Sequence, residues 1–340
     1  MPATTAISTW FVADEAVSAT FFPQVGARSD APEAQAVYWR CTACFFASSL
    51  AQNPAARHLF YTNTNVPVID GVDLAALFAR WGLEVITLPL TFRLPKGAVS
   101  SWGNQFYVFD VLDHFAAQAP AEQLIVLDSD CLWRCPVDAL AAEIDRHGAL
   151  TYELGTDEHP TGEAINGLTR AGMARFLQRN GGPERAEIPY FGGEIYAASL
   201  DATRRIAAAA HALWPQVLAQ DADAPREEAH FLSILYAREG ITPGTANPFI
   251  RRMWTTFHHH NLAPADADLT VWHLPAEKKT GFADLFARIA ADPWADPRAD
   301  PARLGLDAAA LARTMGWPRR PAGKFVRDLG LKLAEKLRRA

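Results

Sequence analysis

The chain has 340 residues, of which 49% are hydrophobic and 21% charged, and this composition predicts a globular protein with a sizeable core. Its formal net charge of -6 makes nucleic acid a poor candidate for a partner, so we expect none. The N-terminus has no basic segment before an apolar stretch, and no apolar run approaches the roughly 20 residues that cross a bilayer. We therefore expect a cytoplasmic protein.

Strands and helices alternate along the first half of the chain. The pattern predicts strands at 7–15, 58–63, 83–90 and 124–130, helices at 38–54, 73–82, 105–118 and 136–148, and a loop at 16–36. The strands are continuous apolar runs, and we find no hairpin signal between them. This pattern predicts an α/β fold with a mostly parallel sheet covered by helices on both faces.

The second half is less regular but also contains both helices and strands. We expect helices at 166–182, 201–220 and 227–240 and strands at 190–200 and 269–275. Residues 291–318 contain many Pro and Asp residues and read as a linker. Residues 319–340 read as a basic amphipathic helix after a single domain that spans residues 1–290.

The run LIVLDSD at residues 124–130 carries an apolar strand directly into two acids. In an extended segment residues i and i+2 point to the same side, so Asp128 and Asp130 can present two carboxylates together. Open α/β sheets bind ligands beyond the carboxyl ends of their strands. A hard divalent cation, Mn²⁺ or Mg²⁺, would offset the repulsion between the acids. The alternative is that one Asp caps the next helix and the other is solvated.

Cysteine and histidine offer two further metal motifs, and we favour neither. The cysteines fall in two pairs, Cys41 with Cys44 and Cys131 with Cys135, but both pairs lie in apolar sequence and are typical of buried thiols rather than of a zinc site. The histidines of the FHHH run at 257–260 are consecutive and cannot all face one metal in regular structure, so this run reads as a polar loop.

The strand ending in D-x-D, together with the ADE sequence at residues 13–15 after the first strand, resembles the GT-A glycosyltransferases. It is most similar to the retaining family-8 type. The resemblance implies that Ala13 and Asp14 contact the nucleotide. It also implies that Asp128, Ser129 and Asp130 lie at the donor diphosphate, where Asp128 and Asp130 hold Mn²⁺. On this reading residues 1–135 are the nucleotide-binding half and residues 136–290 the acceptor-side half.

Three later stretches resemble motifs of the same family in the same order. YFGGEIYAAS resembles the acceptor-side strand, with Gly192 where Asn is common, Gly193 beside it, and Glu194 where an apolar residue is expected. REEAHFLSILY resembles the acidic start of a helix, and there Glu228 matches the acid beneath the sugar. Glu194 is the other candidate for that catalytic role.

The third stretch is WHLPAEKKTGF. Here His273 matches a third metal ligand, and Lys278 or Lys279 matches a diphosphate contact, although the Gly and Pro-Trp of the family motif are missing. Independently of the family, Asn104 and Gln105 stand at the start of the helix predicted at 105–118, where they can contact a donor nucleotide. Helix capping explains Asn104 equally well.

These features together predict a metal-dependent enzyme that moves a hexose from a UDP-sugar to a saccharide acceptor of lipopolysaccharide, capsule or another glycan, with retention. A phosphatase of the haloacid-dehalogenase type also uses a strand ending in D-x-D, and a non-catalytic sugar-nucleotide-binding protein on the same fold is a further alternative. A nucleotidyltransferase would need a Gly-rich, Arg-containing loop near the N-terminus, which the sequence lacks.

The C-terminal segment has a different character from the rest of the chain. From Arg319 onward it contains eight Lys or Arg and two Asp or Glu, a balance of +6 that leaves about -12 for the body. Phe325, Leu329, Leu333 and Leu337 recur every four residues with Val326 alongside. We expect this helix to lie on an anionic membrane surface at the inner face, where a lipid-linked saccharide acceptor would be found. The alternative is a helix packed on the body with a solvated basic face.

Overall fold

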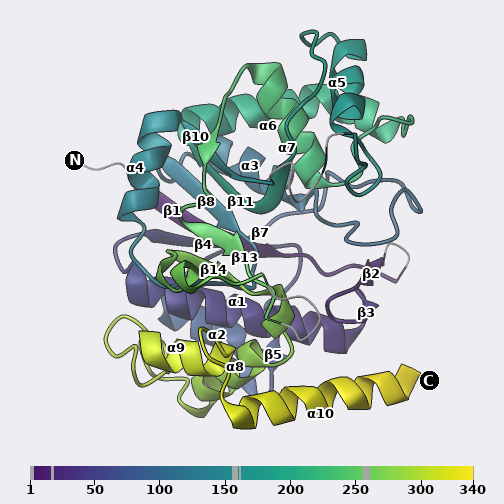
Figure 1. Ribbon diagram of the computed structural model, residues 1–340. Coiled ribbons are helices and arrows are strands. Elements are labelled where there is room, and N and C mark those ends of the chain that lie inside the picture. Colours follow the sequence, from purple (N-terminus) through teal and green to yellow (C-terminus); the bar gives the residue numbers. More distant parts are fainter. Residues whose placement is uncertain (1–3, 17–18, 155–159, 161, 256–260, 340) are drawn as a thin grey trace.

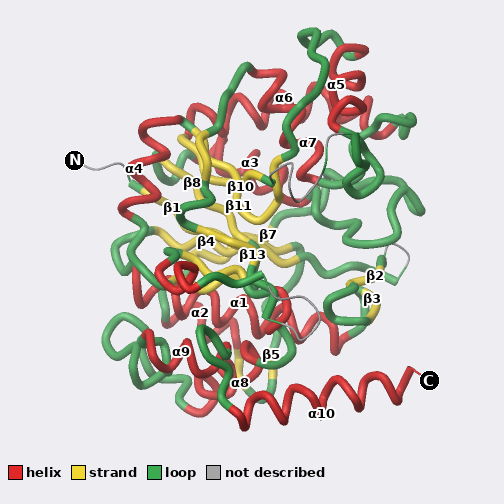
Figure 2. Tube along the Cα trace, in the orientation of Figure 1, coloured by secondary structure: helices red, strands yellow, loops and turns green. Residues whose placement is uncertain are grey.

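A mixed β-sheet runs through the middle of the protein, with helices on both of its faces (Figures 1 and 2). The computed structural model describes residues 4–16, 19–154, 160, 162–255 and 261–339, with residues 334–339 described as backbone alone. Among these residues the main sheet has seven strands, parallel to their neighbours except for β11, which is antiparallel to the strands on both sides. In order across the sheet they are β12 (Gly244–Thr245), β10 (Ala149–Glu153), β11 (Phe191–Ser199), β8 (Gln123–Leu127), β1 (Thr5–Phe11), β4 (Arg57–Thr62) and β7 (Glu84–Thr87).

The predicted α/β architecture is confirmed, and its cause is visible in the strand residues. Along β8, Ile125 and Leu127 pack into the apolar cluster on one face, whereas Leu124 and Val126 pack into the cluster on the other. A strand buried on both faces must be apolar throughout, which is why these strands appear as uninterrupted apolar runs.

The helices divide between the two faces in the same way. The first cluster is shared by α1 (Pro32–Gln52), α2 (Leu74–Arg80), α4 (Asp138–His147), α8 (Gly281–Ala291) and α9 (Ala308–Met315). The second is shared by α3 (Tyr107–Gln118), α5 (Arg170–Arg179), α6 (Leu200–Leu218) and α7 (Glu228–Glu239). In Figure 1 the first set, α4 apart, lies mainly below the sheet and the second set lies above it.

The strand order contains a switch point at the centre of the sheet. From β1 the chain moves outward to β4 and β7 on one side, and then returns to place β8 on the other side of β1. Crossovers that leave in opposite directions open a crevice at the carboxyl ends of the two central strands. The segments that follow β1 and β8 begin at Val12 and Asp128, so both sequence motifs singled out above lie at this crevice.

A smaller sheet stands beside the crevice and joins distant parts of the chain. It consists of β13 (Ile250–Arg252), β14 (Val271–His273) and β9 (Cys131–Trp133), and the short 3-10 helices η1 (Pro264–Asp268) and η2 (Pro275–Glu277) flank β14. The apolar pattern predicts β14 but not β9, which follows β8 after a turn of three residues. It also misses β10, which lies next to β11 in the main sheet.

The region at 16–36, expected to be a loop, holds regular structure. It contains the hairpin of β2 (Phe21–Phe22) and β3 (Ala27–Arg28), and α1 begins at Pro32. Proline suits the first turn of a helix, because its missing N–H has no partner there anyway.

The prediction that hairpin signals are absent is also wrong. β5 (Val68–Ile69) and β6 (Val72–Asp73) are joined by Asp70 and Gly71, both with positive φ, which is the turn that an Asp-Gly pair favours.

The segment at 291–318, expected to be a linker, instead packs against the body. It contains α9, and Leu304, Leu306, Leu311 and Trp317 are buried in the first apolar cluster. Pro and Asp residues here make the turns between α8 and α9, so a composition typical of linkers belongs to a folded segment. After it comes α10 (Ala322–Arg339), which lies along the lower edge of the molecule in Figure 1. In the part of the chain that the structure describes, no helix is both long and apolar enough to cross a bilayer.

Candidate metal centre and its pocket

Asp128 and Asp130 lie where the chain turns from β8 into β9. The N–H of Cys131 donates to the carbonyl of Asp128 at 3.1 Å and closes this turn. The carboxylates therefore meet because of the turn and not because of the two-residue repeat of a strand, on which the prediction rests. The side chain of Asp128 is 44% exposed, whereas that of Asp130 is only 2% exposed.

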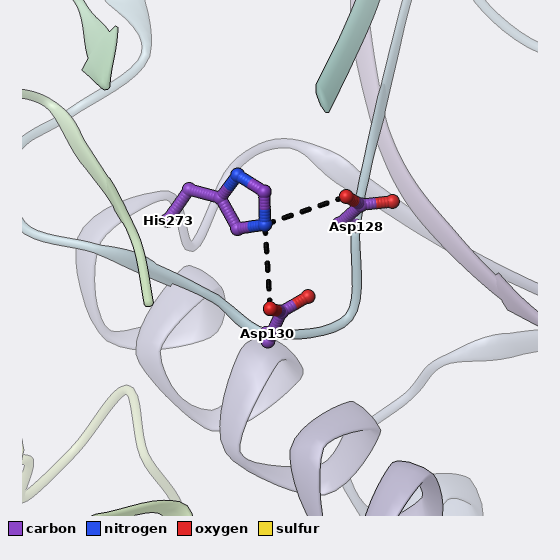
Figure 3. A group of neighbouring side chains, drawn as sticks. All are labelled: Asp128, Asp130 and His273. Carbon is purple, nitrogen blue, oxygen red and sulfur yellow. Dashed lines mark ion pairs between the residues drawn. The ribbon is translucent and has the colours of Figure 1, made fainter. Parts of the chain in front are cut away.

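His273 reaches the two aspartates through the smaller sheet. β14 runs antiparallel to β9 and places His273 opposite Cys131, and the N–H of Leu274 donates to the carbonyl of Asp130 at 2.9 Å. The Nε2 atom of His273 lies 3.4 Å from Asp128 Oδ2 and 3.3 Å from Asp130 Oδ2 (Figure 3). The predicted proximity of His273 to both aspartates is therefore confirmed.

These three side chains form a group that could hold a metal ion. One oxygen from each carboxylate and one imidazole nitrogen all lie within 4.8 Å of one another. The described cysteines enter no such group: Cys41, Cys44 and Cys131 are buried free thiols, as the apolar surroundings predict. The FHHH run at 257–260 lies outside the described residues.

Lys278 adds a positive charge beside the two aspartates. Its Nζ pairs with Asp130 Oδ2, donates to Gln24 Oε1 at 3.3 Å, and lies 5.5 Å from the centre of the Tyr38 ring. Burial raises the pKa of Asp130, but the nearby Lys278 and His273 outweigh it, and the pKa is lowered overall. Burial works the other way on the pKa of Lys278, which Asp130 nevertheless raises, so the ammonium group stays charged.

Lys279, the other candidate from the sequence, has a different position. Its Nζ donates to the backbone carbonyl of Val25 at 3.1 Å, in the turn between β2 and β3. It does not line the pocket described below, whereas Lys278 does. The structure thus favours Lys278 for contact with a ligand.

Glu194 is buried in β11 and is neutralised by Arg252 of β13, with which it forms an ion pair. The space for its carboxylate depends on Gly192, because a Cβ atom there would come within 2.1 Å of Glu194 Oε2. Gly192, a candidate ligand contact in the sequence analysis, therefore makes room for Glu194 and does not itself line the pocket.

Glu228, the first residue of α7, lines the pocket and forms no ion pair with the other described residues. Its Oε2 atom is buried and has no hydrogen-bond partner among the described residues. A Cβ atom at Gly193 would come within 2.1 Å of Glu228 Oε1, so this glycine lets the carboxylate lie against β11. Burial, followed by the charges of Glu227 and Asp128, raises the pKa of Glu228 well above the usual range of glutamate.

A buried hydrogen-bond network holds the start of α7 in place. The hydroxyl of Tyr190 donates to Glu227 Oε1 at 2.7 Å, and the amide of Asn166 donates to Glu227 Oε2 at 2.6 Å. His230 contacts the carbonyl of Ile165 at 2.9 Å, and burial lowers its pKa to about 4, so it is neutral at physiological pH. His230 therefore supports the helix and does not line the pocket.

The segment after β1 lies under the pocket wall. The N–H of Ala13 donates to Asn63 Oδ1 at 2.8 Å, and Asn104 Nδ2 donates to Asp14 Oδ2 at 3.4 Å. Burial raises the pKa of Asp14. Asn104 and Gln105 line the pocket, whereas Ala13 and Asp14 do not, and Asp14 is joined to the pocket wall by its hydrogen bond with Asn104.

The pocket itself has a volume of about 740 Å³. Sites for small molecules and cofactors usually enclose between about 300 and 1,000 Å³, so this cavity is large enough for a nucleotide with an attached sugar. Its walls include Trp10, Tyr38, Ser129, Arg252 and Trp254, of which the sequence analysis names only Ser129.

Nothing in the sequence marks Arg252 as a residue of the pocket. The letters RRMW are an ordinary surface pattern, and no local signal distinguishes the second arginine from the first. The pairing of β13 with β14 sets Arg252 opposite His273 and so brings its guanidinium to the pocket.

Comparison of the chain with protein-family models and with curated protein sequences finds no match.

Proposed function

We propose that the protein is a metal-dependent glycosyltransferase of the GT-A type that transfers a hexose from a UDP-sugar to a saccharide acceptor with retention of configuration. The observation that carries the proposal is the grouping of Asp128, Asp130 and His273 in one pocket with the cation Lys278 and the acid Glu228. The position of this pocket at the switch point of an α/β sheet, where such folds bind ligands, supports it further.

The residues of the group suit Mn²⁺ or Mg²⁺. Carboxylate oxygens are the ligands that hard cations prefer, and Mn²⁺ also accepts imidazole. When bound by Asp128, Asp130 and His273, the ion would supply positive charge at the diphosphate leaving group. Lys278 places a second positive charge in the same pocket, where it can contact a phosphate oxygen as negative charge develops.

Glu228 is the residue best suited to act at the sugar. Glycosyl transfer passes through an oxocarbenium-like state, and a carboxylate near the anomeric carbon stabilises its positive charge. Both Glu194 and Glu228 line the pocket, but Glu194 is already neutralised by Arg252, whereas Glu228 forms no ion pair with another described residue. With Glu228 beneath the sugar ring, the acceptor must approach from the side of the leaving diphosphate, which retains the configuration.

The electrostatics disfavour the phosphatase alternative. In a haloacid-dehalogenase-type reaction the second acid of D-x-D has to donate a proton to the leaving group. The low pKa of Asp130, held by Lys278 and His273, makes it a poor proton donor near neutral pH. The ion pair with Lys278 instead suits an acid that stays ionised as a metal ligand.

The proposal is tested by calorimetry of UDP binding in Mn²⁺ and in EDTA. We expect Mn²⁺ to strengthen binding, and Asp130→Asn to lose most of that gain, by about tenfold or more. Asp113→Asn on α3 is the matched control, because Asp113 pairs with His211 and does not line the pocket. Comparing each variant with and without Mn²⁺ separates loss of the metal from the change in charge around Lys278.

A screen of nucleotide sugars for UDP release then separates an enzyme from a binding protein. Turnover of a UDP-hexose supports the proposal. UDP affinity that is the same in Mn²⁺ and EDTA contradicts the metal site. Metal-dependent UDP binding without turnover of any donor or transfer to any acceptor would assign the pocket to a non-catalytic sugar-nucleotide-binding protein.

A further inference from the structure

The C-terminal helix α10 is attached to the body through charged groups rather than apolar ones. Glu277, at the end of η2, is buried and accepts from Lys324 Nζ at 2.7 Å and from Arg320 at 3.1 Å. Asp328, one turn after Lys324, lies 3.2 Å from the same ammonium group. Lys324 and Asp328 are both buried, so this side of the helix faces the body.

The apolar side chains of α10 are exposed to solvent and do not face the body. Val326 is 67% exposed, Leu329 41% and Leu333 54%, and Phe325 is also partly exposed at 44%. Leu329 follows Asp328 by one position, which turns it about 100° round the helix from the body-facing side. The described part of the stripe that the sequence indicates, Phe325, Leu329 and Leu333, thus faces outward on a helix that is already docked; the side chain of Leu337 lies outside the described ones.

The sequence around this stripe is rich in basic residues. Arg327 and Lys332 belong to the same helix, and the sequence continues with Lys336, Arg338 and Arg339. Arg327 is bound by Asp284 of α8 at 2.6 Å, which further fixes the helix on the body. An occupant of this face must therefore offer an apolar layer and negative charge together.

We propose that α10 lies flat in the surface of an anionic phospholipid bilayer, with Val326, Leu329 and Leu333 in the acyl boundary and the basic residues at the headgroups. A bilayer interface supplies the apolar layer and the negative charge in the same plane, and an amphipathic basic helix is the structure that binds it. This inference stands on the exposure and charge of α10 and does not rest on the proposed enzymatic activity.

The residues that attach α10 to the body lie next to the pocket, so a bilayer that binds α10 would lie at a fixed position relative to the pocket. Glu277, which holds Lys324 and Arg320, directly precedes Lys278, whose ammonium group pairs with Asp130. Thr255 and Thr280 donate to the same buried carboxylate, at 2.6 and 2.7 Å. Because these contacts are buried and charged, the helix is expected to keep its position relative to the pocket when it binds lipid.

The experiment is sedimentation of the full chain with vesicles of phosphatidylcholine alone or mixed with phosphatidylglycerol, at low and high salt. We expect binding to the mixed vesicles that weakens at high salt, and weak binding to phosphatidylcholine alone. Leu329→Glu with Leu333→Glu should reduce partitioning at least tenfold. The matched control is Leu218→Glu, an exposed leucine at the end of α6. That helix lies above the sheet in Figure 1 whereas α10 lies below it, so this variant should bind as the unchanged protein does.

Thermal unfolding establishes that each variant is folded, independently of any activity. The proposal is overturned if the full chain does not sediment with anionic vesicles at low salt, or if the double variant binds as well as the control. A concentration-dependent dimer that the double variant abolishes, without vesicle binding, would assign the stripe to a second copy of the chain instead.

Discussion

At the scale of single residues, Glu194 and Glu228 have the same side chain in opposite surroundings. Arg252 neutralises Glu194, so its charge is already used within the protein. Glu228 has acidic neighbours in Glu227 and Asp128, and its pKa is raised first by burial and then by them. A pocket acid whose charged form is destabilised by burial and by neighbouring acids is typical of a functional group, whereas a buried acid paired with a cation is typical of a structural one.

We predict that Glu228→Gln lowers kcat by about 100-fold or more, because an amide cannot supply the negative charge that the sugar needs in the transition state. Binding of UDP with Mn²⁺ should be unchanged. In the unchanged protein kcat should rise with pH as Glu228 loses its proton, at a higher pH than an ordinary glutamate, and this rise should be absent from the variant. A variant with near-normal kcat, or a product of inverted configuration, would contradict the role of Glu228.

The two glycines of β11 offer a matched pair of tests. We predict that Gly193→Ala lowers turnover, because the added Cβ atom displaces the Glu228 carboxylate. Gly192→Ala displaces Glu194 in the same way and should affect turnover much less. Both changes push against the flexible end of a glutamate, so we expect little loss of stability from Gly193→Ala. Equal losses of turnover in the two variants would show that the strand, and not Glu228, is being disturbed.

At the scale of elements, the pairing of β14 with β9 brings His273 to the two aspartates of the candidate metal group. It places His273 opposite Cys131 and so beside Asp130, although nearly half of the chain separates them. The sequence suggests His273 only through a loose family motif. The structure gives the physical reason, which is a backbone ladder that leaves the imidazole little freedom to lie elsewhere.

The packing of α1 on β4 leads to a prediction about acid stability. His58 of β4 is buried, its Nε2 lies 2.9 Å from Ser49 Oγ of α1, and burial, followed by the charge of Arg298, lowers its pKa to about 4 from 6.5. The contribution of neutral His58 to the free energy of unfolding is complete above pH 6.5 and is lost as the pH falls toward 4. In that range the unfolded chain takes up a proton at this residue and the folded chain does not.

We therefore expect the free energy of unfolding to fall by about 2 kcal/mol more between pH 7.5 and 5 in the unchanged protein than in His58→Gln, which keeps a polar partner for Ser49. Denaturant unfolding at the two pH values measures the difference. His230, also buried and neutral, is common to both proteins and cancels in the comparison. The same pH dependence in both proteins would show that His58 is not the group responsible.

At the scale of the whole molecule, the body and the C-terminal segment carry opposite net charges. The body carries a formal charge of about -12 and the segment from Arg319 onward +6, and the two meet at the buried cluster around Glu277. In Figure 1, α10 forms one edge of the molecule, away from the central sheet. An acidic body would be repelled by an anionic surface, so the basic helix determines which side of the protein can approach a membrane.

The sequence by itself determined the α/β class, most of the helices and strands, and the existence of an acidic motif after a buried strand. These features depend on local periodicity: the apolar run of β8 requires burial on both faces, and the spacing of leucines in α10 requires a helix. Its failures were also local. It missed the Asp-Gly turn between β5 and β6, and it took the turns around α9 for a linker.

Only the tertiary structure decided how the candidate site is built. Arg252 gives no signal in the sequence, and the choices between Lys278 and Lys279 and between Glu194 and Glu228 could not be made there. Each choice depends on which charged groups become neighbours across the two sheets, and on how far burial removes them from water. Strand pairing between distant parts of the chain determines which charged groups become neighbours. Local composition and spacing do not record this pairing, because a charged residue on the surface and one in the pocket can have the same sequence neighbours.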